Sequence, residues 1–178
     1  MDYDEFFRPM PFCAYKPSDR RLHLPANALE ITLGYLRCVG SHESCVFWYG
    51  HRTELGDGEV AAIFAPQQRM TWGNYDVSAA AMSHMLGHVK DDWRPLAQIH
   101  SHPGKMVEHS SYDDQMVSSR RILSIVFPFY GRWNGLWPNH IGVHEWQENY
   151  WHLLSDVDAS KRVQLSESAP IVAKDLRS

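Results

Sequence analysis

The sequence has few cysteines and no long apolar run. Its three cysteines, Cys13, Cys38 and Cys45, are odd in number and lack C-x-x-C spacing, which argues against a disulfide framework or a cysteine zinc site. No stretch approaches the roughly 18 apolar residues that cross a bilayer, and the acidic start MDYDEFFRPM does not have the pattern of a signal peptide. We therefore expect a cytoplasmic protein with no membrane partner.

A cluster of basic residues is also missing from the sequence. The formal net charge of -4 is spread along the chain, whereas proteins that bind nucleic-acid backbones carry a clear excess of positive charge. Nucleic acid is therefore not an expected partner. The 178 residues, 44% of them hydrophobic, are sufficient for one compact domain with a substantial core.

The hydrophobic pattern changes between helical and strand-like periods along the chain. Residues 1–20 form a proline-punctuated lead-in, residues 21–155 form the main domain, and residues 156–178 are expected to be an edge strand or a tail. Apolar spacing and turn residues predict an α+β fold with a mixed sheet flanked by helices. The predicted helices span 25–39, 76–89 (capped by Asp76 or Ser78) and 110–119, and the predicted strands span 43–51, 59–64, 95–99, 122–127, 141–146, 150–154 and 161–165.

One polar pattern lies in the segment IHSHPGKMVEHSSYDD. It contains His100 and His102, then Ser110 after seven further residues, and Asp113 three positions later. On a strand, residues two apart project to the same side, so the two imidazoles can face one ion. A carboxylate in the first turn of the next helix completes a two-histidine, one-carboxylate set, which leaves a zinc ion one open position.

Each half of this pattern has a simpler explanation when it stands alone. His-x-His occurs in strands without a metal, and Ser-x-x-Asp is a common helix cap. With 11 histidines, 16 serines and 12 aspartates in the chain, the whole pattern is expected by chance only about 0.004 times. A catalytic zinc site is therefore predicted. Zinc lowers the pKa of its water to about 7, and a carboxylate outside the ligand set is then needed to move the proton.

The pattern resembles the signature of the JAMM (MPN+) zinc metalloproteases, in which an upstream glutamate precedes His-x-His-x7-Ser-x-x-Asp. Every fixed position is matched, and ESCVFWYG at residues 43–50 is similar to the strand that the family's glutamate opens, although Val46 replaces the usual glycine. The resemblance covers roughly residues 22–154. It implies an MPN/JAB (cytidine-deaminase-like) fold with Zn²⁺ as cofactor, Glu43 as general base and Ser110 as a hydrogen-bond donor to the tetrahedral oxyanion.

The same resemblance implies a substrate. It is to compact isopeptidases that remove or process a ubiquitin-like protein at its C-terminal tail, and in particular to bacterial JAMM deubiquitinase-like proteins encoded beside ubiquitin-transfer enzymes in antiphage operons. An extended tail can bind such a cleft as an added strand, and E1/E2-like enzymes are further expected partners. Two alternatives stay open: a zinc peptidase acting on another small amide or sulfur-carrier adduct, and a non-catalytic MPN scaffold that binds ubiquitin-like partners.

Other polar and aromatic residues have simpler interpretations. His84 and His88 are four apart on a predicted helix and could ligate a second metal, but an exposed pair is favoured because no third ligand is evident. Glu108 and His109 are expected to be solvated loop residues that could rim the site. The aromatic and glycine-containing segment 130–139 is a candidate lining of a substrate groove.

Overall fold

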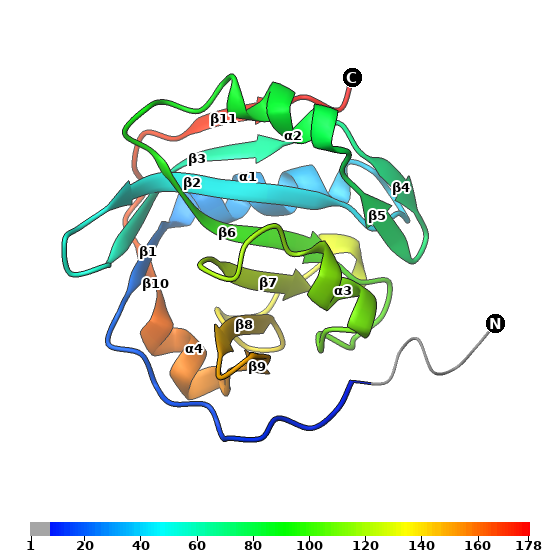
Figure 1. The fold of residues 1–178 in the computed structure, drawn as a ribbon. Helices are drawn as coiled ribbons and strands as arrows, with labels where there is room; N and C mark the ends of the chain where they lie inside the picture. The colour runs from blue at the N-terminus through cyan, green and yellow to red at the C-terminus, as the bar shows by residue number, and fades with distance from the viewer. Residues whose placement is uncertain (1–7) are drawn as a thin grey trace.

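The computed structural model describes residues 8–178, which form an α+β fold in which a curled mixed sheet is flanked by four helices (Figure 1). Residues 1–7 of the predicted lead-in lie outside the described residues. The strands are β1 (Leu22–Pro25), β2 (Cys45–Arg52), β3 (Gly58–Ala65), β4 (Arg69–Thr71), β5 (Asn74–Asp76), β6 (Arg94–Ser101), β7 (Leu123–Phe127), β8 (Gly142–Gln147), β9 (Tyr150–Leu153), β10 (Val163–Ser166) and β11 (Val172–Asp175). The helices are α1 (Ala26–Arg37), α2 (Ala79–Leu86), α3 (Ser111–Met116) and α4 (Asp156–Arg162), with a 3₁₀ turn η2 (Phe129–Gly131).

The strands of the large sheet follow the order β10-β1-β3-β2-β6-β7-β8-β9, and β11 pairs with the part of β3 that β1 leaves uncovered. Strand β6 runs antiparallel to β2 and parallel to β7. Strands β4 and β5 form a separate two-stranded hairpin. The start of β2 and the end of β6 therefore lie side by side at one end of the central strands, where Cys45 pairs with His100.

The central strand β2 is buried on both faces because its side chains alternate between two apolar clusters. Val46 and Trp48 contact the larger cluster under α1, whereas Phe47 and Tyr49 belong to the cluster under α2. The indole nitrogen of Trp48 donates a 2.8 Å hydrogen bond to Thr32 of α1, so the only polar atom of this buried ring is satisfied. Strand β2 is thus packed against apolar side chains on both of its faces.

Most predicted elements are present, with boundaries shifted by a few residues. The second helix is shorter than predicted: Ser78 is its cap, and Asp76 belongs to β5 instead. The predicted strand 161–165 was partly wrong, since Lys161 and Arg162 end helix α4, whose serine cap Ser155 accepts from the Asp158 N–H. Strands β1, β4, β5 and β11 were not predicted.

The segment after residue 155 is part of the fold. Strand β10 extends the large sheet beside β1, and β11 pairs in parallel with β3. Along residues 8–178, no helix is both long enough and apolar enough to span a membrane.

Candidate metal centre

His100 lies near the end of β6, and its side chain is fully buried. Its backbone is fixed by two neighbouring strands, with Cys45 of β2 on one side and Val126 of β7 on the other. A histidine in the middle of a sheet cannot change its position without breaking these pairings. The sheet therefore fixes the first predicted ligand.

His102 follows the strand, and two contacts hold it. Its backbone N–H donates to the Phe127 carbonyl at 2.9 Å, and its ring Nδ1 lies 2.9 Å from the Met106 carbonyl. A carbonyl oxygen only accepts, so Nδ1 carries a proton and Nε2 is the nitrogen that faces the site. This is how a metal-binding histidine is commonly oriented.

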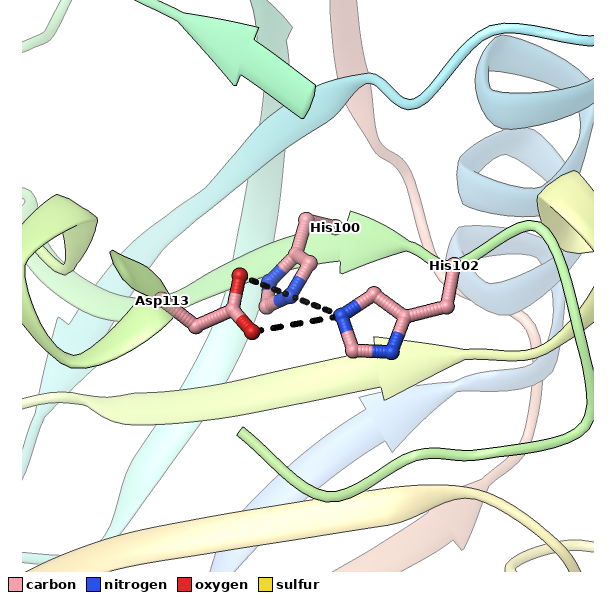
Figure 2. A group of neighbouring side chains, drawn as sticks. All are labelled: His100, His102 and Asp113. Carbon is pink, nitrogen blue, oxygen red and sulfur yellow. Dashed lines mark hydrogen bonds and ion pairs between the residues drawn. The ribbon is translucent and has the colours of Figure 1, made fainter. Parts of the chain in front are cut away.

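Asp113 reaches the two histidines from the first turn of α3, as predicted. Its Oδ1 lies 3.3 Å from Nε2 of His100 and its Oδ2 lies 3.4 Å from Nε2 of His102, while the two Nε2 atoms are 3.1 Å apart. Figure 2 shows the carboxylate facing both rings. Ligand atoms at about 2.0–2.1 Å around a tetrahedral zinc are about 3.3 Å from each other. These separations therefore fit the ligand set of a zinc ion.

The charge states of Asp113 and His100 suit a bound cation. Burial raises the pKa of Asp113, but the two histidines outweigh burial and hold this pKa well below its usual range. Burial lowers the pKa of His100, against the opposing effect of Asp113. For His102, burial also lowers the pKa, but hydrogen bonding and charge at Asp113 outweigh it and raise the value. An ionised carboxylate beside a neutral His100 is what metal binding needs.

Ser110 organises Asp113. The serine hydroxyl donates to Asp113 Oδ2 at 2.7 Å and accepts from the Asp113 N–H at 3.1 Å, while the Ser110 N–H donates to the same Oδ2 at 2.7 Å. These reciprocal bonds are a capping box at the start of α3. In this arrangement the Ser110 hydroxyl proton is directed at the Asp113 carboxylate. The donation of this proton to an oxyanion stays a prediction.

Glu43 lies two residues before β2 rather than opening it, and its N–H donates to the Thr71 carbonyl of β4 at 2.8 Å. The residue is only 5% exposed and lines the same cleft as His102 and Asp113. Burial raises the pKa of Glu43 to about 7, with His102 lowering it and Asp113 raising it further. A carboxyl group with a pKa near neutrality can both accept and release a proton at physiological pH.

The cleft beside these residues has a volume of about 570 Å³. Trp72 and Gly73, at the tip of the β4–β5 hairpin, form one side, and Met106 and Glu108, in the loop after β6, form another. Trp72 and Met106 are largely exposed, at 73% and 59%. The cleft is therefore open to a ligand larger than water and presents apolar surface beside the polar centre.

Two buried histidines behind the site were missed by sequence reasoning. His109 was expected to be solvated, which was wrong: it is 4% exposed, its Nδ1 lies 2.9 Å from Asp114 and its Nε2 lies 2.8 Å from Ser124. Its ring stacks on that of fully buried His144, with centroids 3.8 Å apart. The alternation Gly-Val-His in β8 is the one sequence signal that places His144 on an inner face.

The remaining candidates lie away from the metal ligands. His84 and His88 have their ring centroids 5.1 Å apart, and among residues 8–178 only His100, His102 and Asp113 form a group of three or more metal-ligating side chains close enough to share an ion. Segment 130–139 borders a separate hollow of about 310 Å³ that includes Trp133 and His140. Tyr130 connects this segment to the hairpin, since its hydroxyl donates to the Trp72 carbonyl.

Comparisons with known proteins inform the fold only. No protein-family model matches the sequence, and no curated protein matches it. The solution structure of protein DSY2949 from Desulfitobacterium hafniense is similar with a TM-score of 0.63 and 15% identity, over 82% of this chain and 93% of that one. A solution structure from Salinibacter ruber is similar with a TM-score of 0.50 and 16% identity, over 75% of this chain and 88% of that one.

Proposed function

We propose that the protein is a zinc-dependent isopeptidase of the JAMM type, with an MPN fold, that acts at the C-terminal tail of a ubiquitin-like protein. The observation that carries this proposal is the convergence of His100, His102 and Asp113, at ligand-like separations, on a cleft that also contains Glu43. All four groups are those required by the sequence signature described above. Glu43 comes from a segment more than 50 residues before the other three, so its place in the same cleft does not follow from the His-x-His-x7-Ser-x-x-Asp spacing.

The chemistry divides between the ion and the chain. His100, His102 and Asp113 would hold a zinc ion, which would supply the Lewis acidity that makes water a nucleophile near neutral pH. Glu43 takes the proton of the attacking water and passes it to the nitrogen of the leaving amine. Its partly buried carboxyl, with a pKa of about 7, suits both steps.

The form of the cleft supports an extended peptide as the substrate. The β4–β5 hairpin is paired within itself, and Trp72 and Gly73 at its tip line the cleft. An extended tail that lies along such a hairpin gains backbone hydrogen bonds, and small side chains such as those of glycine let it approach the metal. Gly104, on the other side of the cleft, also leaves room for the backbone, since a Cβ at this residue would meet nothing within 4 Å.

Replacement of Glu43 tests the mechanism. With zinc supplied and a ubiquitin-like protein fused through its tail to a cargo, Glu43→Gln is expected to lose about 10²- to 10⁴-fold in cleavage rate. It should still bind one equivalent of zinc, because Glu43 is not among the three ligand side chains. The measurements are single-turnover cleavage and metal content of the purified variant.

Glu108→Gln is the matched control, because Glu108 is an exposed carboxylate that lines the same cleft. It should cleave at a rate close to that of the parent protein. Full activity of Glu43→Gln would disprove the general-base role. A parent protein that holds less than about a tenth of an equivalent of zinc after zinc addition, and that cleaves nothing, would favour the scaffold instead.

A further inference from the structure

Four arginines converge on one pocket at the end of the sheet opposite the metal centre. The pocket is lined by guanidinium-bearing residues from four separate segments: Arg21 before β1, Arg52 at the end of β2, Arg121 before β7 and Arg162 at the end of α4. They are far apart in sequence, so no basic run indicates them. The chain as a whole carries a net charge of -4, and this local concentration of positive charge is therefore a feature of the fold.

The pocket contains no balancing carboxylate. Its remaining lining residues are glycines and leucines, Gly56, Gly58, Leu22, Leu96 and Leu123. Arg162 is paired with Glu145 at 2.9 Å, but along residues 8–178 no acidic side chain forms an ion pair with the other three arginines. Asp57, which lies between the lining residues Gly56 and Gly58, accepts from the backbone N–H of Arg21. Several like charges over an apolar floor are mutually repulsive unless an anion joins them.

Arg52 is the fixed member of the group. Its Nη2 donates to the carbonyls of Pro95 and Arg121, both at 3.1 Å, so its guanidinium is positioned by the strands beside it. The side chains of Arg21 and Arg121 donate no hydrogen bond to any other described residue. Their donors are therefore available to a ligand, next to one guanidinium that is already oriented.

The size of the pocket selects the ligand. The space at its centre is about 20 Å³, little more than a single water-sized sphere requires. A base or a sugar is too large to enter it, whereas a small anion at its mouth can direct one oxygen into this space while its other oxygens face the guanidinium groups. Guanidinium groups bind tetrahedral phosphate oxygens through paired, charge-assisted hydrogen bonds. We propose that this arginine pocket binds a phosphate group, either as the free ion or as the terminal group of a phosphomonoester.

The proposed phosphate site is independent of the metal centre. Leu96 of the pocket and His100 of the site lie on the same strand β6, and four residues of strand separate them by about 13 Å. Phosphate binding should therefore be the same in the Glu43→Gln variant. A failure of the isopeptidase proposal leaves this one standing, and the reverse is also true.

The test is a titration of the full-length protein with inorganic phosphate at low ionic strength, followed by amide NMR shifts. Saturable shifts are expected at Gly56, Gly58 and Leu96, with a dissociation constant in the millimolar range, and they should weaken as sodium chloride is added. Arg21→Gln and Arg121→Gln should each weaken binding about tenfold, which is the loss of one charge-assisted hydrogen-bond pair. Neither the Arg21 nor the Arg121 side chain donates a hydrogen bond to another described residue, so these substitutions should not destabilise the fold.

Arg37→Gln is the matched control, because it removes the same charge at the far end of α1, where Arg37 bonds only the Leu33 carbonyl. It should bind phosphate like the parent. A parallel titration with O-phosphoserine separates the two sources: tighter binding than inorganic phosphate identifies a phosphomonoester, and equal binding identifies the free ion. The proposal would be overturned if the shifts did not saturate, if succinate bound as tightly as phosphate, or if both arginine variants kept the affinity of the parent for phosphate.

Discussion

Ser110 can serve the site in two ways, and the geometry separates them. Its hydroxyl already bonds Asp113 Oδ2 at 2.7 Å and caps α3, which positions a metal ligand. The resemblance to JAMM enzymes assigns it instead to the oxyanion. Positioning acts on metal binding as well as on rate, whereas oxyanion stabilisation acts on rate alone.

Ser110→Ala should therefore weaken zinc binding about tenfold, because bonds that orient a ligand commonly contribute 10- to 100-fold to metal affinity. The lost cap should also cost about 1 kcal/mol of unfolding free energy. Competition with a zinc chelator and urea denaturation measure the two effects. Ser111→Ala is the control, since the neighbouring serine makes no side-chain hydrogen bond along the described chain. Unchanged zinc affinity with a slower rate would favour the oxyanion role.

At this scale the sequence predicts what depends on spacing and misses what depends on distant neighbours. His100, His102 and Asp113 were predictable because a strand and a helix start fix their directions. The burial of His109 was not, because it follows from Ser124 of β7 and from Asp114, whose charge is paired with Arg8 at 2.7 Å. No local pattern specifies that such a loop histidine is covered.

Among the elements, the long and strongly patterned ones were predictable and the short edge strands were not. Strand β2 carries one β-branched and three aromatic side chains in a row, Val46 to Tyr49, which is a clear strand signal. Strand β11 has four exposed residues, so it shows no burial pattern at all. Its existence depends on the uncovered edge of β3 and on side chains beyond its end.

One of those side chains is that of Arg177, which connects the end of β11 to helix α1 by a hydrogen bond. Its guanidinium donates to the Tyr35 carbonyl at 2.8 Å and pairs with Asp175 at 2.6 Å. Arg177→Ala should therefore release β11, and amide exchange at residues 173–175 should accelerate about tenfold, as expected for the loss of hydrogen bonds to a charged group. Hydrogen-exchange mass spectrometry measures this change.

Val172→Thr, an exposed substitution in the same strand that keeps the β-branched shape, should leave the exchange rates nearly unchanged. Exchange in strand β6, which carries His100, should stay slow in both variants, because β6 is paired on both sides by β2 and β7. Equal exchange of β11 in the parent and in Arg177→Ala would contradict the role of this contact.

The molecule as a whole buries ionisable histidines in its interior, and this links its stability to pH. Burial lowers the pKa of His109 and of His144 well below the usual histidine value. The unfolded chain binds protons at a pKa of about 6.5 that the native state does not bind. The free energy of unfolding is therefore not reduced by these two histidines above that pH. Below it, the free energy of unfolding falls by about 1.4 kcal/mol per pH unit for each histidine. His102, with a raised pKa, acts in the opposite direction.

His144→Leu should flatten this dependence. Between about pH 6 and 5, in the presence of a chelator, the free energy of unfolding of the variant should fall by about 1.4 kcal/mol less per pH unit than that of the parent. Urea denaturation at a series of pH values measures the slope. His140→Asn is the control, because His140 is exposed and has a positive φ of 63° that asparagine tolerates. Equal slopes in the parent and His144→Leu would show that this histidine binds no fewer protons in the native state.

Strand β1 pairs with β10, and Leu22 lies beside Val163, which is 141 positions further along the chain. At a synthesis rate of about 5–20 residues per second, roughly 7–28 s separate the appearance of these two strands on a ribosome. During that interval the outer edges of β1 and β3 have no strand to cover them, although the segment that carries His100, His102 and Asp113 has already been made. A nascent chain with exposed strand edges is prone to pair with other chains. We expect this protein to depend on chaperones during its synthesis more than its small size suggests.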